Sequence, residues 1–433
     1  MSYQEAIDFL FTSLPMYQRE GKAAYKNNLD NTHKLDSWFG HPHRNYPTIH
    51  VAGTNGKGSV SHMIASVLQA SGQKTGLYTS PHLLDFRERI KINGQPIPEK
   101  EVTGFVSGNQ KIIQEISPSF FEMTVAMAFD YFSREQVDVA VIETGLGGRL
   151  DSTNIITPVL SVITNISKDH TEFLGNHPSS IAREKGGIIK KNIPLIIGRA
   201  EAPTEEVLLS IASERGASVT CANRVYEPRF KTLTQDGTML LRIGKPLNAS
   251  MRTISSDLSG EYQQENIITA LTALEKLQKL DWKITESHIL EGFASVKSST
   301  GITGRWQTIG HNPKSICDTA HNVDGIAAVV RQIKQIPWLR LHMVWGMVSD
   351  KDLDMILPLL PEEATYYFTS SSVPRSMDAK ELSQRALEFG LKGESFSKVE
   401  KAYKAAQKEA GADDMIFTGG STFVVADLLL MKI

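Results

Sequence analysis

The sequence has little of several features that define specialised classes of protein. Only two of its 433 residues are cysteines, and Cys221 and Cys317 lie far apart and form no C-x-x-C pair. This pattern argues against a disulfide scaffold and favours the reducing cytoplasm, with both thiols buried in the core. The chain also has no basic excess, because 46 basic and 48 acidic residues give a formal net charge of -2. A dedicated nucleic-acid-binding protein usually has such an excess, so we expect no nucleic-acid partner.

Long hydrophobic runs are also missing. No apolar stretch approaches the roughly 18 residues of a membrane-spanning helix, so we expect no membrane partner. The first residues, MSYQEAIDFLFTSLPM, contain acids and no basic leader, which does not fit a secretory signal. The apolar fraction of 41% suits a globular protein with a packed core. The length predicts about two or three domains.

Strand-like runs alternate with helical stretches along most of the chain. The expected strands of the first part are 48–52, 75–79, 137–142, 159–164 and 194–197, and its expected helices include 58–70, 99–115, 121–133 and 179–190. Several of these strands are nearly continuous apolar runs, which is typical of parallel strands covered on both faces. The sequence therefore predicts an α/β protein whose large N-terminal domain is a doubly wound, mostly parallel sheet.

A change in composition divides the chain. The segment SSTGITG at 298–304 is small, polar and glycine-rich, as expected of a hinge linker. Beyond it the alternation restarts, with strands expected at 315–318, 341–345, 365–369 and 415–418. We therefore expect a first domain at 1–297, the linker, and a smaller Rossmann-like α/β domain at 305–433. The first domain exceeds the usual size and is expected to contain insertions.

The segment HVAGTNGKGSV at 50–60 is a candidate phosphate-binding loop. It departs from G-x-x-x-x-G-K-[ST], because no glycine stands five residues before Gly56 and a glycine follows Lys57. It nevertheless joins a predicted strand to a predicted helix, so its N–H groups and the helix N-terminus would face an anion. Lys57 would supply charge for the terminal phosphates, and Ser59 a hydroxyl for phosphate or Mg²⁺. The competing interpretation is a glycine-rich turn with a solvated lysine.

Polar clusters follow three other predicted strands, where ligands bind in parallel sheets. Ser80 could bind Mg²⁺ or cap a turn, and Glu143 could bind a metal or form an ion pair. Arg149, in the glycine-rich segment after Glu143, could contact a substrate or be a surface charge. Asp169 and His170 are candidate metal ligands or general bases, or else polar loop residues.

Three more polar residues lie in or next to predicted loops. Lys185 lies on a predicted helix and, taken alone, would be a surface lysine. Asp318 and His321 follow a strand of the second domain. They could reach a nucleotide, or act as a capping aspartate and a loop histidine.

Taken together, these motifs resemble the Mur ligase superfamily, of which the loop G-T-N-G-K-G-[ST] is characteristic. The narrower resemblance is to the folylpolyglutamate synthases and dihydrofolate synthases. It rests on SPHL at 80–83, FFE at 120–122, ETGLGGRLDSTN at 143–154, DHTEFLG at 169–175, REKGGIIK at 183–190, GRW at 304–306 and DTAHN at 318–322. The motifs follow the family's order from about residue 48 to 420. Two small departures are Gly186, where alanine is frequent, and Thr144, where valine is frequent.

The resemblance implies an activity. It points to an ATP-dependent amide ligase that adds L-glutamate to dihydropteroate or to folate (poly)glutamates through an acyl phosphate, with Mg²⁺. It also implies a monomer that acts on small molecules. Two alternatives stay open: a Mur-type ligase acting on a UDP-sugar peptide, and a nucleotide-switch ATPase.

The resemblance also implies roles for individual residues. The ATP-binding set is Gly53, Thr54, Asn55, Gly56, Lys57, Gly58, Ser59, Asn266, Arg305, Asp318 and His321. The Mg²⁺ ligands are Ser80, Glu143 and His170. The catalytic residues are Lys57, His170 and Lys185, the last of them carrying a carbamate. The substrate-binding residues are His82, Phe121, Glu122, Arg149, Leu150 and Asp151.

Overall fold

The computed structural model of the chain describes residues 1–15, 28–169, 171–175, 177–234, 237–246 and 251–431. They form two compact units. The first comprises Met1–Asp257 and Gln263–Ile302, and the second comprises Leu258–Tyr262 and Thr303–Ile433. Within the described part of the chain, no helix combines the length and apolar character needed to cross a membrane.

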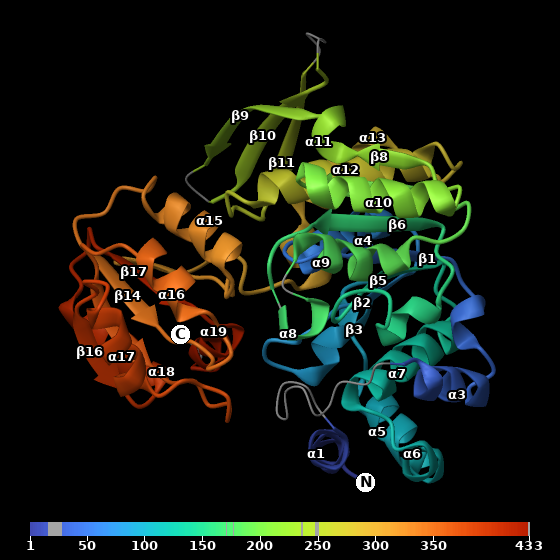
Figure 1. The fold of residues 1–433 in the computed structure, drawn as a ribbon, viewed down its shortest axis with the longest axis horizontal. Helices are drawn as coiled ribbons and strands as arrows, with labels where there is room; N and C mark the ends of the chain where they lie inside the picture. Colours follow the sequence, from blue (N-terminus) through green and yellow to red (C-terminus); the bar gives the residue numbers. More distant parts are fainter. Residues whose placement is uncertain (16–27, 170, 176, 235–236, 247–250, 432–433) are drawn as a thin grey trace. The chain divides into compact units, whose positions relative to one another are not determined.

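The first unit is built on an eight-stranded sheet of order β4-β3-β2-β5-β1-β6-β7-β8 (Figure 1). Its strands are β1 Thr48–Ala52, β2 Thr75–Tyr78, β3 Ile90–Ile92, β4 Gln95–Pro96, β5 Val139–Glu143, β6 Leu160–Asn165, β7 Leu195–Arg199 and β8 Val219–Cys221. In sheet order, the strands β2, β5, β1, β6, β7 and β8 are parallel. At the β2 edge, β3 is antiparallel to β2 and β4 is antiparallel to β3. The predicted mostly parallel sheet is thus confirmed.

Helices cover this sheet because its strands are apolar on both faces. All five residues of β5 are buried, and Ala140 and Ile142 belong to a core cluster built with α7 (Phe120–Arg134). Helix α4 (Lys57–Ala70) contacts β1, β2 and β5 and is itself packed by α12 (Gln263–Gln278) and α13 (Glu286–Ala294). A helix buried on this many sides needs an apolar, small-residue sequence, which KGSVSHMIASVLQA supplies.

Two predicted helices differ from the structure. The expected helix 99–115 is two helices, α5 (Glu99–Gly108) and α6 (Gln110–Ile116), which meet at Asn109. The expected helix 179–190 is α9 (Pro178–Lys185), followed by a 3-10 turn. Just beyond α9, Gly187 packs closely against a neighbouring segment, since a Cβ there would lie 2.3 Å from Arg149 Cα.

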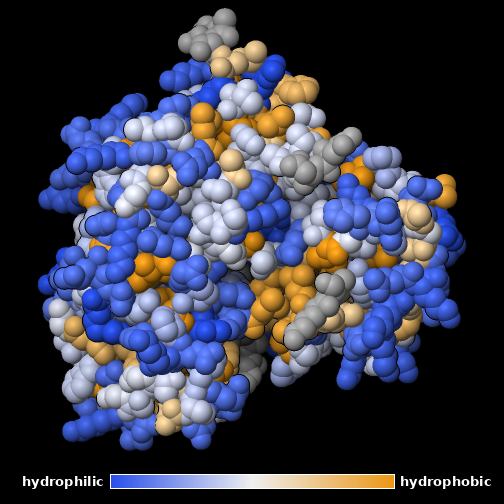
Figure 2. Space-filling view, turned by 180° about the vertical axis from the view of Figure 1, so that it is seen from behind, coloured by the Kyte–Doolittle hydropathy of each residue, from blue (hydrophilic) through white to orange (hydrophobic). Residues whose placement is uncertain are grey.

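A three-stranded antiparallel sheet in the first unit was not expected. Its strands are β9 (Glu227–Leu233), β10 (Met239–Gly244) and β11 (Met251–Ser256), with β10 in the middle. It stands between β8 and α12 in the chain. Figure 2 shows one face of the molecule, on which hydrophilic residues predominate and hydrophobic ones form smaller areas. Phe230 and Met251 of the three-stranded sheet are among the exposed large hydrophobic residues.

The second unit contains a six-stranded sheet of order β12-β13-β17-β14-β15-β16. The strands are β12 Gln307–His311, β13 Lys314–Cys317, β14 Leu341–Trp345, β15 Thr365–Thr369, β16 Gly393–Phe396 and β17 Met415–Gly419. Only β12 runs antiparallel to its neighbour. The helices include α15 Val323–Ile333, α17 Ala379–Leu387, α18 Val399–Glu409 and α19 Thr422–Leu429. The predicted Rossmann-like arrangement is confirmed.

The segment expected to be a linker, 298–304, begins inside a helix. Its first three residues end α14 (Val296–Thr300), and the Thr300 side chain is fully buried. Lys91 Nζ donates to the carbonyl oxygens of Thr300 (2.8 Å) and Gly301 (3.2 Å). The change to left-handed backbone comes at Gly301 and again at Gly304. The hinge role of this segment stays a prediction.

Candidate active site

The predicted phosphate loop, Gly53–Ser59, connects β1 to α4 and is held by the end of β6. Thr54 N donates to Asn165 O (3.0 Å), and Asn55 N donates to Asn165 Oδ1 (2.8 Å). Thr164 Oγ1 in turn donates to Asn55 O (2.6 Å). Because Thr54 and Asn55 are both tied to the end of β6, the first part of the loop, just before the start of α4, is held in place.

Two glycines of this loop are required by their neighbours. Gly53 and Gly56 have φ of 151° and 83°, which disfavour other residues. A Cβ would lie 1.9 Å from Thr164 Oγ1 at Gly53, and 2.2 Å from Asn266 Oδ1 at Gly56. The loop is therefore pressed against side chains from β6 and α12, and its glycines serve close packing as well as backbone freedom.

Lys57 and Ser59 lie where the loop enters α4. Lys57 Nζ donates to the carbonyl oxygens of Gly53 and Thr54, both at 3.1 Å, so its charge stays over the loop. Ser59 is buried, and its Oγ accepts a hydrogen bond from Gln263 Nε2 (3.1 Å). The Ser59 hydroxyl proton is then available to a phosphate oxygen. Lys57 is thus half-buried and tied to the loop, while its role at a phosphate stays a prediction.

Helix α12 contributes two polar residues beneath the loop. Asn266 Nδ2 donates to Gln263 Oε1 (2.8 Å), and both side chains are buried. Asn266 was expected near ATP, whereas Gln263 was not predicted. The available signal was its position one helical turn before Asn266, which places both side chains on the same helix face.

Lys185, at the end of α9, is only 3% exposed, so the surface-lysine interpretation is wrong. Its Nζ donates to Gly53 O (2.7 Å), the same carbonyl that Lys57 contacts. Burial lowers the pKa of Lys185 well below its ordinary value, and the Lys57 charge lowers it further. The structure therefore places a lysine with a weakly basic amine against the phosphate loop.

The predicted metal ligands Ser80 and Glu143 lie together. Glu143 ends β5, is 3% exposed, and accepts a hydrogen bond at Oε2 from Ser80 N (3.3 Å). Hydroxyl and carboxylate oxygens suit Mg²⁺. The third predicted ligand, His170, lies outside the described residues. Among the described residues, no group of three or more His, Cys, Asp and Glu side chains gathers as a metal site.

Phe121 and the glycine-rich segment after Glu143 are brought together. The Phe121 ring lies against Gly145, where a Cβ would be 2.5 Å from the ring. The Tyr78 ring lies 6.2 Å from the Phe121 ring, centroid to centroid. Glycine at 145 therefore leaves room for a partly exposed aromatic surface beside the end of β5.

Two of the predicted substrate-binding acids have structural contacts. Asp151 is buried, and its Oδ2 accepts the N–H groups of Gly145 (2.8 Å) and Leu146 (2.9 Å). Burial raises its pKa, and the hydrogen bonds oppose this. Glu122 accepts the Ser119 N–H (2.6 Å) in a capping box at the start of α7. A substrate contact by either acid stays a prediction.

The other predicted substrate residues differ in exposure. Arg149 is exposed and pairs with Glu184 (2.9 Å), and Leu150 is partly exposed. His82 Nδ1 accepts a hydrogen bond from Arg89 Nε (2.7 Å). Burial, followed by the Arg89 charge, lowers the pKa of His82 to about 3, so His82 is neutral at physiological pH. Arg89 itself is buried and was not predicted.

In the second unit, Asp318 follows β13 and is 1% exposed. Its Oδ2 accepts hydrogen bonds from Tyr262 OH (2.5 Å) and Trp306 N (2.7 Å). Burial raises its pKa, while the Arg305 charge opposes the shift. Helix α15 is capped by Asn322 and not by Asp318, whose Oδ1 instead accepts the N–H group of Ala320 (2.8 Å).

His321 and Tyr262 also belong to the second unit. His321 Nδ1 lies 3.1 Å from Thr319 O. Tyr262 was not predicted, and it belongs to the short segment Leu258–Tyr262 that is compact with the second unit although it precedes α12 in the chain.

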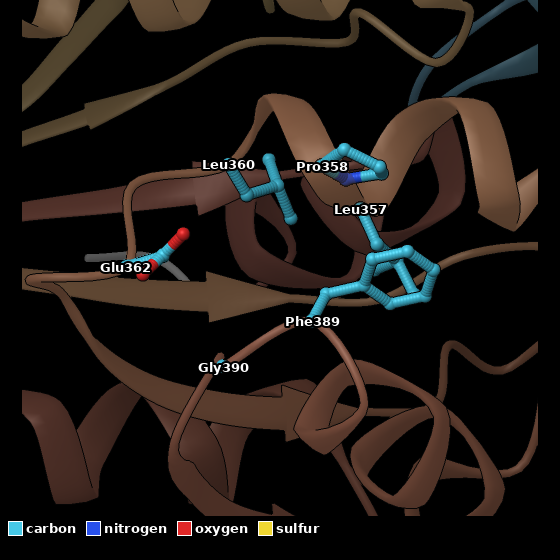
Figure 3. Close-up of a pocket in the computed structure, with 6 residues that line it drawn as sticks. All are labelled: Leu357, Pro358, Leu360, Glu362, Phe389 and Gly390. Atoms are coloured by element: carbon cyan, nitrogen blue, oxygen red, sulfur yellow. The ribbon is translucent and has the colours of Figure 1, made fainter.

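A separate pocket in the second unit includes none of the predicted site residues (Figure 3). It is lined by Leu357, Pro358, Leu360, Glu362, Phe389 and Gly390. Apart from Glu362, its walls have no charged group, so it offers no chemistry for a phosphate or a metal.

Comparison with known proteins agrees with the sequence motifs. Residues 51–274 match the Mur ligase middle domain, and residues 304–422 match the Mur ligase glutamate ligase domain. The chain is 31% identical to the folylpolyglutamate synthase of Lacticaseibacillus casei over 439 residues, covering 97% of this chain and 96% of that one. It is 34% identical to the Escherichia coli dihydrofolate synthase/folylpolyglutamate synthase over 381 residues, covering 88% and 85%.

A larger relative comes from Haloferax volcanii. The chain is 31% identical to a probable bifunctional folylpolyglutamate synthase/dihydropteroate synthase there, and 99% of it spans only 50% of that protein.

Solved structures show the same fold. Mycobacterium tuberculosis folylpolyglutamate synthase, complexed with ADP and AMPPCP, matches with a TM-score of 0.85 at 31% identity, covering 93% of this chain and 95% of that one. E. coli FolC, in complex with DHPP and ADP, matches with a TM-score of 0.84 at 29% identity, covering 100% and 98%. The predicted family is therefore confirmed, and the chain belongs to the folylpolyglutamate synthase and dihydrofolate synthase family of the Mur ligase superfamily.

Proposed function

We propose that this protein is an ATP-dependent ligase that joins the amino group of L-glutamate to a carboxylate of a pteroate or folate. The observation that carries the proposal is the anchored loop Gly53–Ser59, on which Lys57 and the buried Lys185 converge at one carbonyl oxygen. Such a loop suits a polyphosphate, and family membership selects the ligase reaction over a nucleotide switch.

The reaction needs an activated carboxylate. A carboxylate is a poor acyl donor, because its leaving group would be oxide. Transfer of the γ-phosphoryl group from ATP gives an acyl phosphate, whose leaving group is phosphate, and the amine of glutamate then attacks the carbonyl carbon. Lys57, the loop N–H groups and the Ser59 hydroxyl would stabilise the negative charge that develops on the phosphoryl oxygens.

The donor set at the end of β5 fits Mg²⁺. Ser80 and Glu143 would hold the ion together with His170. The bound ion would neutralise phosphate charge and orient the nucleotide. Asn266 in the first unit, and Arg305, Asp318 and His321 in the second, are the further residues that we propose to contact ATP.

Lys185 is proposed to carry a carbamate. Burial lowers the pKa of its amine well below the ordinary value, which favours the neutral form, and a neutral amine is the form that reacts with CO₂. The amine nitrogen attacks the carbon of CO₂, so that an N–C bond forms as one C–O π bond of CO₂ opens, and the loss of one proton leaves the neutral amine as an anionic carbamate. Intact-mass measurement in bicarbonate buffer, with Lys185→Ala as the control, tests this directly.

Phosphate release tests the function as a whole. Mg-ATP and L-glutamate would be supplied with dihydropteroate, tetrahydrofolate or a UDP-sugar peptide as the third component. Release with both pterins means a bifunctional enzyme, and release with one identifies the step performed. Release only with the sugar peptide, or without any acceptor, would refute the proposal. Lys57→Ala serves as the inactive control.

We also propose that the protein acts as a monomer in the cytoplasm. Size-exclusion chromatography with light scattering would report the mass in solution, and a dimer would contradict the first part.

A further inference from the structure

His50 is a buried titratable residue that the proposed chemistry does not use. It lies in the middle of β1 and has no exposed surface. Its Nε2 atom lies 2.9 Å from Thr153 Oγ1, more than a hundred positions away in the chain. The other residues of β1 are Thr48, Ile49, Val51 and Ala52, so His50 is the one ring with polar nitrogens in this buried strand. Burying such a ring costs stability unless its nitrogen atoms form hydrogen bonds.

The direction of this hydrogen bond follows from the next contact. Thr153 Oγ1 lies 2.5 Å from Asp151 Oδ1 and donates its proton to that carboxylate. Its oxygen therefore accepts, and His50 must carry a proton on Nε2. His50 Nδ1 has no hydrogen-bond partner among the described residues, which fits this tautomer. Burial, with a smaller effect of the Lys190 charge, lowers the pKa of His50 to about 3, so the ring is neutral at physiological pH.

Asp151 links the Thr153 side chain to the backbone after β5 through hydrogen bonds. Its Oδ1 accepts from Thr153, and its Oδ2 accepts the N–H groups of Gly145 and Leu146. A single carboxylate thereby sets where the chain lies immediately after β5. Gly145 is also the residue against which the Phe121 ring packs. A small rotation of Asp151 would move Gly145 and change the surface next to Phe121.

We propose that His50 is a positioning residue, which acts through Thr153 and Asp151 to hold Gly145 and Leu146 in place beside Phe121 for the pteroate or folate substrate. The inference rests on the proposed function, because Phe121 matters only if this region binds the pterin. His50 touches neither the substrate nor ATP in this scheme. Its hydrogen bond is to Thr153 and not to the phosphate loop, although His50 is only three residues before Gly53.

The test compares His50→Leu with His50→Gln, in which the glutamine amide nitrogen replaces the Nε2 donor. Steady-state phosphate release would be measured with the acceptor that supports wild-type turnover. His50→Leu leaves a buried hydroxyl oxygen without its donor, and we expect the KM for the acceptor to rise about tenfold. The kcat and the KM for ATP should stay within about twofold of wild type, and His50→Gln should restore most of the loss.

Thr153 offers an independent pair of variants, which keeps the test decisive if His50→Leu does not fold. Thr153→Val should behave like His50→Leu, and Thr153→Ser like wild type. The double variant His50→Leu/Thr153→Val should be no worse than either single variant, because both break one chain of hydrogen bonds. His342→Leu, which removes a buried histidine of the second unit from Tyr367 and Asp414, is the control for a general loss of stability.

Hydrogen exchange gives a readout without substrate. The amides of Gly145 and Leu146 should exchange faster in His50→Leu and Thr153→Val and recover in His50→Gln. The inference is overturned if these amides are unchanged, if KM for ATP rises as much as KM for the acceptor, or if His50→Gln behaves like His50→Leu. If instead the wild type releases phosphate with no pterin acceptor, the proposed function fails, while faster exchange would still establish the positioning of the loop.

Discussion

Replacing Gly56 by alanine tests why the phosphate loop needs a glycine there. One reason is the left-handed backbone, and the other is the close packing against Asn266. Gly56 has a φ of 83°, and Gly72, just beyond the other end of α4, has a φ of 85°. Both substitutions force an alanine into left-handed backbone, at about 1–2 kcal/mol each. They differ in surroundings, because a Cβ on Gly72 meets nothing within 4 Å, whereas a Cβ on Gly56 would lie 2.2 Å from Asn266 Oδ1. Gly72→Ala is therefore a matched control.

The additional effect of Gly56→Ala follows from what Asn266 holds. Its side chain must move, since a separation of 2.2 Å is too short for any non-bonded pair. Asn266 donates to Gln263, and Gln263 donates to Ser59, so the displacement reaches the hydroxyl proposed to contact phosphate. A misplacement of about 1 Å at a reacting group can reduce turnover on the order of 10²-fold. We expect kcat/KM to fall by about that factor in Gly56→Ala and to stay within about twofold of wild type in Gly72→Ala.

Two measurements check this prediction. Urea unfolding should show a stability loss of about 1–2 kcal/mol in Gly72→Ala and a larger loss in Gly56→Ala, where the Asn266 side chain must also move. Phosphate release should show a large loss of activity in Gly56→Ala alone. Equal activity in the two variants would refute the reasoning, since it would mean that contact with Asn266 is irrelevant. An additional test is the double variant Gly56→Ala/Asn266→Ala, whose effects should not add if the displaced amide is the cause.

Three other outcomes are expected. Lys57→Ala should reduce kcat by about 10²-fold or more, while Lys57→Arg retains part of the activity, and near-normal turnover of the alanine variant would rule out its assigned role. Wild-type activity should fall in CO₂-free buffer and return with bicarbonate, whereas Lys185→Ala should respond to neither. Because burial lowers the pKa of His50 to about 3, the unfolded chain binds more protons than the folded one below about pH 6.5, so acid destabilises the fold. Urea unfolding at pH 7 and pH 5 should show a loss about 2 kcal/mol greater in wild type than in His50→Gln.

The strand–loop–helix at residues 48–70 could be predicted because its information is local. TIHVA is buried throughout, and the expected helix 58–70 begins one residue late relative to α4. The glycines of the connecting loop indicated a phosphate-binding loop without any knowledge of distant contacts. The four strands expected in the second unit were likewise found within a residue of their bounds. In each case a short apolar run and the turn after it carry the signal.

The three-stranded antiparallel sheet was missed because its stability depends on pairing between segments. Strand β9 reads EPRFKTL and is mostly exposed or partly exposed, so it has neither a continuous apolar run nor a clear alternation. Only β10, the middle strand, buries a regular set of residues, Met239, Leu241 and Ile243. Such a segment can be recognised as a strand only when the strands that pair with it are known. Reading the sequence alone does not give that pairing.

The acids of the substrate motifs show a second limit. Glu122 and Asp151 were expected to bind substrate, and the structure shows carboxylates that accept backbone N–H groups of their own segments. An acid in a family motif can thus be present because it shapes the loop that carries the site. The sequence contains the same letters in either case. The structure adds the distances from each oxygen to its backbone donors, and a further contact of either acid with substrate stays a prediction.

Lys57 and Lys185 place two amino groups close to each other, and the positive charge of one disfavours a positive charge on the other. Lys57 and Lys185 both reach Gly53 O, and the charge of Lys57 is one of the causes that lower the pKa of Lys185. Asp169 and Asp151 oppose that shift, but burial outweighs them. A carbamate on Lys185 would replace repulsion between two amines by attraction between an anion and Lys57. The Lys57 charge, which helps to make Lys185 a poor cation, would therefore also favour its conversion into an anion.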